Sequence, residues 1–312
     1  MDQITQKLRK LYADSDEGLA KFIDGYFYQR YSALYVYYLK KFSNQFNGKD
    51  EVLIYPEDKS DPVIDDLVKA TTDQIIPGLL KRETNVYHGK VVKLDDAVKL
   101  VTIDRNINLP SLPETIIPYK KARDLILENP DHICVIDCPC RTTKENPCTP
   151  VDVCIIIGDP FVSFVLENNL DNPRKLTVDE AIDIIKAEDD RGHVHTAFFK
   201  DAMADRFYCI CNCCKCCCTA MGAHFIDTPM LAASGYLCDI NDDCAGCGNC
   251  NTFCQFGALD LIDERTVVDE EKCMGCGVCE SKCDVEAITL KRDPSKGEPL
   301  DVHELIPELA GN

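Results

Sequence analysis

Cysteine is the residue type with the greatest capacity for chemistry in this sequence. The chain has 312 residues and 21 cysteines, and all of the cysteines lie between Cys134 and Cys283. An odd number leaves at least one thiol unpaired in any set of intramolecular disulfides, which favours metal or cluster ligation instead. Eight cysteines form two runs of the same spacing, C-x₂-C-x₂-C-x₃-C, at a constant offset of 29 residues. The sequence therefore encodes two equivalent ligand loops.

Each run has the spacing that holds a cubane 4Fe–4S cluster. A tight loop can direct three thiolates to one cluster, while the fourth cysteine points away and reaches the other cluster. Glycines within the runs favour this interpretation, because the loop N–H groups must approach the sulfur atoms closely. A pair of zinc knuckles is the alternative, since zinc also accepts four thiolates. The predicted ligands are Cys244, Cys247, Cys250 and Cys283 for one cluster, and Cys273, Cys276, Cys279 and Cys254 for the second.

With these two runs, residues 238–290 resemble the bacterial-type ferredoxins that carry two 4Fe–4S clusters. The family usually has proline directly after the fourth cysteine of each run, whereas this chain has Gln255 and Asp284. No ligand is missing, so the resemblance implies that both clusters assemble. The departure bears on the reduction potentials, because hydrogen bonds and nearby charge tune them.

A second set of cysteines precedes this region, and the segment from Cys209 to Cys218 holds seven of them in ten residues. Cys213 and Cys216, and likewise Cys214 and Cys217, have C-x₂-C spacing, and Cys138 and Cys140 could complete a site across the domain. Three interpretations stay open: a third iron–sulfur cluster, a thiolate zinc site, and a redox-active thiol or unusual cluster site. The candidate ligands of this third site are Cys138, Cys140, Cys148, Cys154, Cys211, Cys213, Cys214, Cys216, Cys217 and Cys218.

Four further residues are weaker candidates for metal or cluster ligands. Cys134 and Cys238 stand apart from both sets, and we interpret each as a buried free thiol. His193 and His195 lie one residue apart, on one face of a strand-like segment. A histidine ligand is conceivable there, but structural histidines with satisfied hydrogen bonds are the favoured interpretation.

The cysteine-rich segment also has a recognisable layout. Residues 116–290 are similar to a poorly characterised group of iron–sulfur proteins from anaerobes that end in a two-cluster ferredoxin domain. The similarity rests on Cys138-Pro139-Cys140-Arg141, on Gly192-His193-Val194-His195, and on Cys211-Asn212-Cys213-Cys214 followed by Cys216-Cys217-Cys218. It implies an electron-transfer or oxidoreductase-associated role and leaves open what the middle cysteines bind.

The division of the chain follows the cysteines. Residues 1–113 contain none and are predicted to be a helix-rich N-terminal region. Residues 114–235 form the cysteine-rich α/β domain, 236–290 the two-cluster ferredoxin domain, and 291–312 a C-terminal tail. The predicted fold class is α+β, with a helical N-terminal region, an α/β middle domain and a C-terminal ferredoxin-like βαβ repeat.

Several single elements can be predicted within these regions. A helix is expected around 61–80, short strands within 86–103, and a helix over 119–128. Thr177 begins a capping-box pattern, so we expect a helix from there that Gly192 terminates.

Composition excludes two classes of function. The formal net charge is −19, which opposes binding to nucleic-acid phosphates. The tyrosine-rich stretch 26–39 is too short for a membrane span and is interrupted by Arg30, so an amphipathic helix is favoured. The N-terminus lacks the basic and apolar segments of a signal peptide, and with the thiol content this predicts a cytoplasmic protein.

Charge and motifs also predict the kind of partner. Residues 238–290 contain 12 Asp and Glu against three Lys and Arg, and an acidic surface can steer a basic partner to a cluster. The sequence has no dinucleotide fingerprint or P-loop. We therefore expect a flavoprotein or dehydrogenase as the redox partner of a single-electron carrier. The alternatives are a reductase whose middle cysteines are catalytic, by residues that the sequence does not identify, and a redox or metal sensor.

Overall fold

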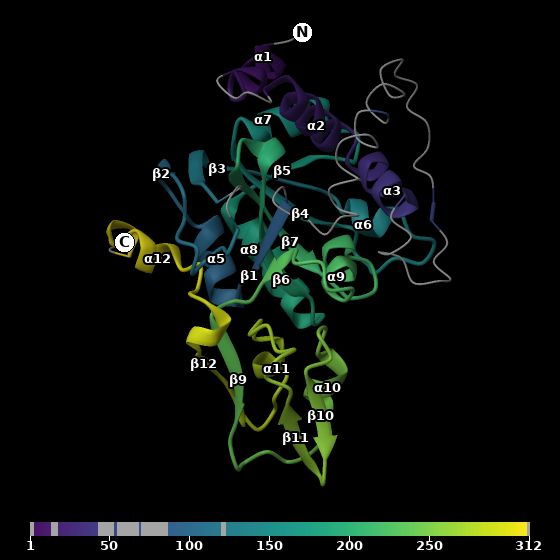
Figure 1. The fold of residues 1–312 in the computed structure, drawn as a ribbon, viewed down its shortest axis with the longest axis vertical. Helices are drawn as coiled ribbons and strands as arrows, with labels where there is room; N and C mark the ends of the chain where they lie inside the picture. Colours follow the sequence, from purple (N-terminus) through teal and green to yellow (C-terminus); the bar gives the residue numbers. More distant parts are fainter. Residues whose placement is uncertain are drawn as a thin grey trace.

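The structure, a computed structural model, has a mixed α+β fold (Figure 1). It describes residues 3–13, 18–42, 53–54, 69, 87–119 and 123–310. Apart from residue 69, the helix expected around 61–80 lies outside these residues. Among the described residues, no helix combines the length and the apolar character that a membrane-spanning segment requires.

One mixed sheet forms the centre of the molecule, in the strand order β2-β3-β4-β7-β6-β1-β8, with β5 beside β3. All of its pairings are antiparallel except the one between β1 and β8. Its strands are β1 (Tyr87–Val91), β2 (Ile107–Leu109), β3 (Leu125–Asp137), β4 (Asp152–Asp159), β5 (Arg174–Leu176), β6 (Val194–Lys200), β7 (Arg206–Cys213) and β8 (Leu231–Ala232).

Side chains alternate between the two faces of this sheet and make two different cores. On β4, Ile155 and Ile157 belong to one core, and Cys154 and Ile156 to the other. On β7, Ile210 faces the first core and Cys209 the second. Because side chains of a strand alternate with a period of two, one face of the sheet is aliphatic and the other carries the cysteines.

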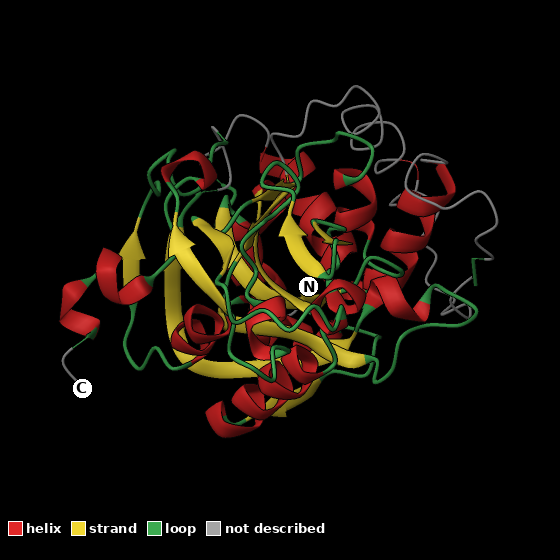
Figure 2. Cartoon of the chain, turned by 90° about the horizontal axis from the view of Figure 1, so that it is seen from below, coloured by secondary structure: helices red, strands yellow, loops and turns green. Residues whose placement is uncertain are grey.

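Helices cover both faces (Figure 2). The aliphatic face packs against α5 (Leu94–Val101), α8 (Val178–Asp190) and α12 (Val302–Leu305). The cysteine face is covered by α1 (Gln3–Lys10), α2 (Gly18–Arg30), α3 (Ser32–Phe42), α7 (Phe161–Asn168) and α9 (Thr219–His224). The tyrosine-rich stretch 26–39 thus lies in two helices that pack on the cysteine face.

Three of the expected local elements can be compared with the structure. The capping box is confirmed: the Thr177 side chain accepts from the Glu180 N–H, and α8 ends before Gly192 at φ +80°. Within 86–103, β1 is followed by the helix α5 rather than by further strands. The helix expected over 119–128 is wrong, since none of the described residues 119 and 123–128 is helical, and β3 begins at Leu125 and pairs with β2. Sheet pairing overrides the local helical preference there.

The central sheet also draws on the cysteine-free segment. Strands β1 and β2 come from residues 1–113, yet β1 pairs with β6 and β2 pairs with β3. The C-terminal tail contributes as well, since Leu300 and Val302 are buried in the aliphatic core. These segments therefore take part in one core with the middle region.

A smaller unit projects from one end of the sheet (Figure 1). Its first strand pairs with its last, β9 with β12, and β10 pairs with β11, both antiparallel. The two short helices α10 and α11 follow Gly248 and Gly277, each at positive φ, so the duplication in sequence is a duplication in structure. The elements are β9 (Tyr236–Ile240), α10 (Asn249–Phe253), β10 (Leu259–Ile262), β11 (Arg265–Val268), α11 (Val278–Ser281) and β12 (Ile288–Arg292).

Candidate functional site

The small unit contains a cavity lined by cysteines from both runs. Cys273, Cys276 and Cys279 come from the second run, and Cys254 comes from the first. Gly275 and Gly277 line the same cavity, so the backbone can approach its contents without a side chain in between. The structure thus brings together the four cysteines that the spacing predicts for one cluster. Four thiols around one cavity are a donor set that fits a 4Fe–4S cluster.

Backbone N–H groups point at the thiols in the same way in both repeats. The N–H of Ala258 donates to Cys254 Sγ at 3.2 Å, and the N–H of Ala287 donates to Cys283 Sγ at 3.2 Å. Backbone hydrogen bonds at Thr266 and Gly246 lower the pKa of Cys244. Donors of this kind stabilise the thiolate, which is the form that binds a cluster.

The other four predicted cluster ligands occupy the equivalent positions of the two repeats. Cys247 is exposed, Cys250 is buried, and Cys244 and Cys283 are intermediate. The side chain of Asn249 in α10 donates to the backbone carbonyl of Lys282 at 3.1 Å. The end of the second run, with Cys283, therefore lies beside the first repeat, as an exchange of fourth cysteines requires.

Cys238 is a fifth thiol at the first cavity. It is buried and lines the cavity, and its Sγ lies 3.6 Å from Cys279 Sγ. In the other repeat, Thr266 Oγ1 lies 3.6 Å from Cys250 Sγ. Cys238 is a buried free thiol, as expected, but it does not stand apart from the other cysteines, because the pairing of β9 with β12 brings it to this cavity. Cys134, in contrast, is a fully buried core thiol, and burial raises its pKa to about 12.

The middle region divides its cysteines between two groups rather than one. The first group, hereafter the four-thiol group, is formed by Cys148, Cys214, Cys216 and Cys217, whose Sγ atoms all lie within 4.8 Å of one another. Cys216 Sγ lies 2.9 Å from Cys148 Sγ and 3.6 Å from Cys217 Sγ. Zinc–sulfur bonds of about 2.3 Å place tetrahedral thiolates about 3.8 Å apart. The separations in this group therefore suit one metal ion.

The second group lines a cavity of about 100 Å³ on the cysteine face of the sheet. Cys213 Sγ lies 3.3 Å from Cys218 Sγ, and Cys211 Sγ lies 3.9 Å from Cys154 Sγ and 3.8 Å from Cys209 Sγ. Hydrogen bonds also connect Cys138 to Cys140 and to Cys154, and Cys140 to Cys218. Nine cysteines line this cavity, and two of them, Cys214 and Cys217, belong to the four-thiol group. The other seven, hereafter the seven-thiol group, are Cys138, Cys140, Cys154, Cys209, Cys211, Cys213 and Cys218.

Strand register explains how the seven-thiol group assembles. Cys209, Cys211 and Cys213 occupy every second position of β7 and so project toward one face. Ile155 of β4 pairs with Ile210 of β7, which brings Cys154 beside Cys211. The ends of two short helices complete the group: Cys138 precedes α6 (Pro139–Thr142), and Cys218 precedes α9.

Cys209 is the member of the group that the sequence prediction left out of the third site. The spacing of two residues between Cys209, Cys211 and Cys213 was the available signal, because it marks one face of a strand. Four tyrosines line the same cavity, namely Tyr28, Tyr35, Tyr87 and Tyr208. They come from three distant segments of the chain, so no local signal linked them to the cysteines.

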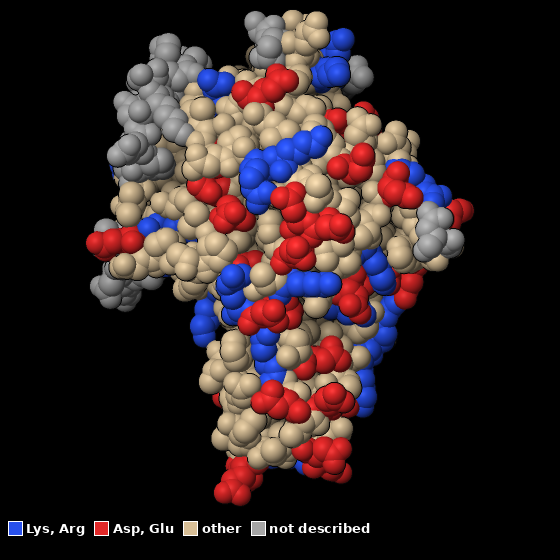
Figure 3. All heavy atoms as spheres, turned by 180° about the vertical axis from the view of Figure 1, so that it is seen from behind, with Lys and Arg blue, Asp and Glu red and all other residues tan. Residues whose placement is uncertain are grey.

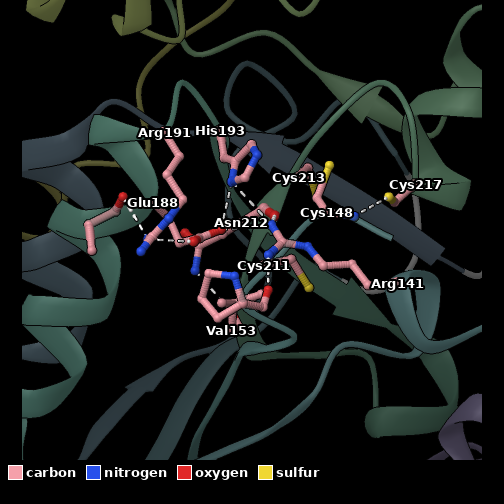
Figure 4. A network of polar contacts seen from close by, with 12 residues as sticks. Arg141, Cys148, Val153, Glu188, Arg191, His193, Cys211, Asn212, Cys213 and Cys217 are labelled. Atoms are coloured by element: carbon pink, nitrogen blue, oxygen red, sulfur yellow. Dashed lines mark hydrogen bonds and ion pairs between the residues drawn. The ribbon is translucent and has the colours of Figure 1, made fainter. Parts of the chain in front are cut away.

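Arg141, which follows Cys140 in α6, connects this helix to the sheet and to α8 (Figure 4). Its guanidinium is buried and donates to Glu188 Oε2 at 2.6 Å and to the Asn212 carbonyl at 3.1 Å. His193 Nδ1 is 2.6 Å from the same carboxylate oxygen, and His195 Nδ1 is 2.7 Å from Asn212 Oδ1. Both histidines therefore have a structural hydrogen bond at Nδ1, as the favoured interpretation expects, although the buried His195 Nε2 has no hydrogen-bond partner among the described residues and lies 3.6 Å from Asp189 Oδ1.

The buried Glu188 carboxylate makes the stability of this network depend on pH. Burial alone would raise its pKa, but hydrogen bonds with His193 and Arg141 outweigh burial, and the pKa of Glu188 is lowered. A depressed carboxyl pKa stabilises the fold above the unfolded value of 4.5, and this contribution is lost as the pH falls through the folded pKa. We expect the difference in unfolding free energy between the wild type and Glu188→Gln to shrink below pH 4.5. Urea titrations at several pH values measure it, and a difference independent of pH would contradict the assignment.

Gln255 connects the small unit to the four-thiol group. Its Nε2 donates to the Gly192 carbonyl at 2.8 Å, and its Oε1 accepts from the Lys215 N–H at 3.0 Å. Lys215 lies between Cys214 and Cys216, and Gln255 directly follows Cys254. The glutamine that replaces the usual proline therefore joins a cluster cavity to the middle cysteines.

Comparison with known proteins finds one family. Residues 266–289 match the 4Fe–4S binding domain family, so this part of the chain is an iron–sulfur domain of the ferredoxin type. The match includes the second cysteine run and ends before the tail. No curated protein and no solved structure matches the chain.

Proposed function

We propose that this protein transfers single electrons through two 4Fe–4S clusters in its C-terminal unit. One observation carries the proposal: Cys254 of the first run lines the same cavity as Cys273, Cys276 and Cys279 of the second. That exchange of the fourth cysteine is the arrangement of two-cluster ferredoxins. A bound 4Fe–4S cluster supplies a reversible one-electron couple.

The chain's own groups would hold the clusters and adjust their potentials. Cys254, Cys273, Cys276 and Cys279 would hold one cluster, while Cys244, Cys247, Cys250 and Cys283 would hold the other. The N–H groups of Ala258 and Ala287 donate to one thiol of each set. Hydrogen bonds to cluster sulfur favour the reduced, more negative state, so these donors raise the reduction potential.

The four-thiol group is our proposed third metal site. Four sulfur atoms within 4.8 Å of one another suit a single tetrahedral ion, zinc or iron, rather than a cubane. Cys214 and Cys217 are buried and Cys216 is exposed. An ion bound to these three thiols and to Cys148 would join their loop to the segment that carries Cys148. Gln255 provides a direct connection from this loop to the cluster held by Cys254.

The partner we propose is a flavoprotein or dehydrogenase with a basic docking surface. The C-terminal unit is strongly acidic, and the Asp242 side chain is 99% exposed. Acidic side chains lie at the tip of this unit, furthest from the central sheet (Figure 3). Complementary charge speeds association and weakens with salt. The rate of electron transfer to a basic redox protein should therefore fall as the ionic strength rises.

Metal and sulfide analysis of anaerobically purified protein tests the cluster assignment. Cys250→Ser and Cys279→Ser should each remove about four irons, since each change removes one ligand of one cubane. The two variants should lose different EPR signals of the reduced protein. Cys134→Ser, at a buried thiol outside the cavity, is the matched control and should keep both signals. Unchanged iron content in either cluster variant would refute the assignment.

A reductase is the second candidate function, and the seven-thiol cavity favours it. Four tyrosines line this cavity beside the thiols, so a substrate there would meet hydroxyl groups able to donate protons. The test is reoxidation of the reduced protein by candidate substrates. Substrate-dependent reoxidation that Cys211→Ser, a change within the seven-thiol group, abolishes would favour the reductase over the carrier.

A further inference from the structure

We propose that the seven-thiol cavity holds a polynuclear iron–sulfur cluster of its own, separate from the two C-terminal clusters and from the ion of the four-thiol group. This adds a cofactor site to the proposed function and can fail without it. The observations that carry it are the arrangement of the sulfur atoms, the shape of the cavity and the polar groups that surround it.

The sulfur arrangement excludes a single ion for the whole group. Among the described residues, only the four-thiol group has three or more thiols that all lie within 4.8 Å of one another. The seven thiols instead follow one another around the cavity wall, with neighbouring Sγ atoms such as those of Cys213 and Cys218 at 3.3 Å. One ion needs all of its ligands close to one another, as they are in the four-thiol group. Several irons bridged by sulfide can bind thiolates spread around a wall.

The two groups draw on one short segment and meet at the cavity. Cys213 and Cys218 belong to the seven-thiol group, whereas Cys214, Cys216 and Cys217 between them belong to the four-thiol group, of which Cys214 and Cys217 also line the cavity. The segment is a turn, in which the N–H groups of Cys217 and Cys218 donate to the Cys214 carbonyl. The segment therefore serves two centres at once, which explains why seven cysteines occur within ten residues.

The wall opposite the thiols is built from α2 and α3, including Tyr28, Val36 and Leu39. This wall is largely apolar, and such surroundings exclude water from a cluster and alter its potential. Lys40, also in α3, is buried and donates from Nζ to the Cys140 carbonyl at 3.1 Å. Its positive charge offsets the negative charge of nearby thiolates.

A β-bulge supplies a hydroxyl group to the same cavity. Phe198 pairs with Cys209 and Phe199 with Phe207, so Tyr208 is the extra residue of β7. Bulges re-aim side chains, and here Tyr208 joins Cys209 on the cysteine face. The Tyr208 hydroxyl is hydrogen-bonded to the Cys209 thiol and lies 2.7 Å from the Tyr28 hydroxyl. An O–H donor beside a cluster ligand is the outer contact that such centres use.

The test is the iron, zinc and acid-labile sulfide content of the anaerobically purified full chain. Two 4Fe–4S clusters account for about eight sulfides, and the proposal requires more than eight. The double variant Cys154→Ala/Cys211→Ala removes two facing thiols of the cavity. It should lose the excess iron and sulfide while the EPR signals of the C-terminal clusters persist.

Matched variants separate the centres. Cys148→Ser/Cys216→Ser in the four-thiol group should lose one metal ion and no sulfide, and Cys134→Ala should lose neither. The sulfide content of the wild type tests the proposal even if the double variants unfold. Intact EPR signals of the C-terminal clusters together with only eight sulfides would overturn the proposal. Equal sulfide in the wild type and the cavity variant would also overturn it. Absence of both C-terminal EPR signals in the wild type would instead contradict the proposed function.

Discussion

Replacing Arg141 with methionine is expected to lower the free energy of unfolding by about 3–5 kcal/mol, the usual cost of breaking a buried ion pair. The side chains of Arg141 and Glu188 are each 1% exposed. The substitution leaves the Glu188 carboxylate buried without its main cation, and the Asn212 carbonyl loses its guanidinium donor. Since Arg141 follows Cys140 and Asn212 lies between Cys211 and Cys213, both cavity walls should loosen.

Thermal unfolding of anaerobically purified protein measures this effect, with a midpoint about 10 °C lower for the variant. Arg191→Met is the matched control, because Arg191 pairs with the same carboxylate at 2.9 Å but is 43% exposed. Exposed ion pairs contribute about 0–1 kcal/mol. Equal losses in the two variants would show that burial of the Arg141 pair is not what stabilises the network.

Gly275→Ala should remove the cluster held by Cys254, Cys273, Cys276 and Cys279, with the loss of about four irons per chain. Gly275 has φ +64°, and a Cβ there would collide with the carbonyl of Tyr236 and with Ser234 Oγ. The nearest of these atoms belongs to the backbone of Tyr236 and cannot rotate away, so the loop that contains Gly275 must shift. The shift would move Cys273 and Cys276, which flank the glycine, away from the cavity.

The matched control for this variant is Gly257→Ala. Gly257 has φ +62°, but a Cβ there would have no neighbour within 4 Å. The alanine would cost about 1–2 kcal/mol for its left-handed backbone, without a collision. Iron and sulfide analysis with EPR of the reduced protein should show two C-terminal clusters in this control and one in Gly275→Ala. Identical cluster content in both would mean that the close approach at Gly275 is dispensable.

The chemistry of the C-terminal unit could be predicted from the sequence because its ligands lie close together along the chain. The spacing of Cys273, Cys276 and Cys279 defines a loop whose geometry is local, and residues 266–289 are a 4Fe–4S binding domain. The capping box at Thr177 is local for the same reason, since its two hydrogen bonds span three residues. The predicted assignment of ligands to two clusters stays a prediction that the iron analysis will test.

The sites of the middle region depend on contacts between distant segments. Cys154 and Cys211 are 57 residues apart in sequence, and only the register of β4 against β7 makes them neighbours. Tyr208 reaches the cavity through a bulge, which local preferences do not encode. Cys238 lies at the cluster cavity because β9 pairs with β12, the last strand of the unit.

The sequence by itself determined which atoms are available for chemistry, namely the 21 thiols and the iron–sulfur character of the second run. The tertiary structure decided how the middle thiols are grouped: four converge as one metal ion would require, and seven others line a cavity that two of the four also reach. The physical reason is that a spacing along the chain specifies a loop, whereas a site on a sheet is specified by strand order, register and face. Those three properties arise only when the whole sheet has formed.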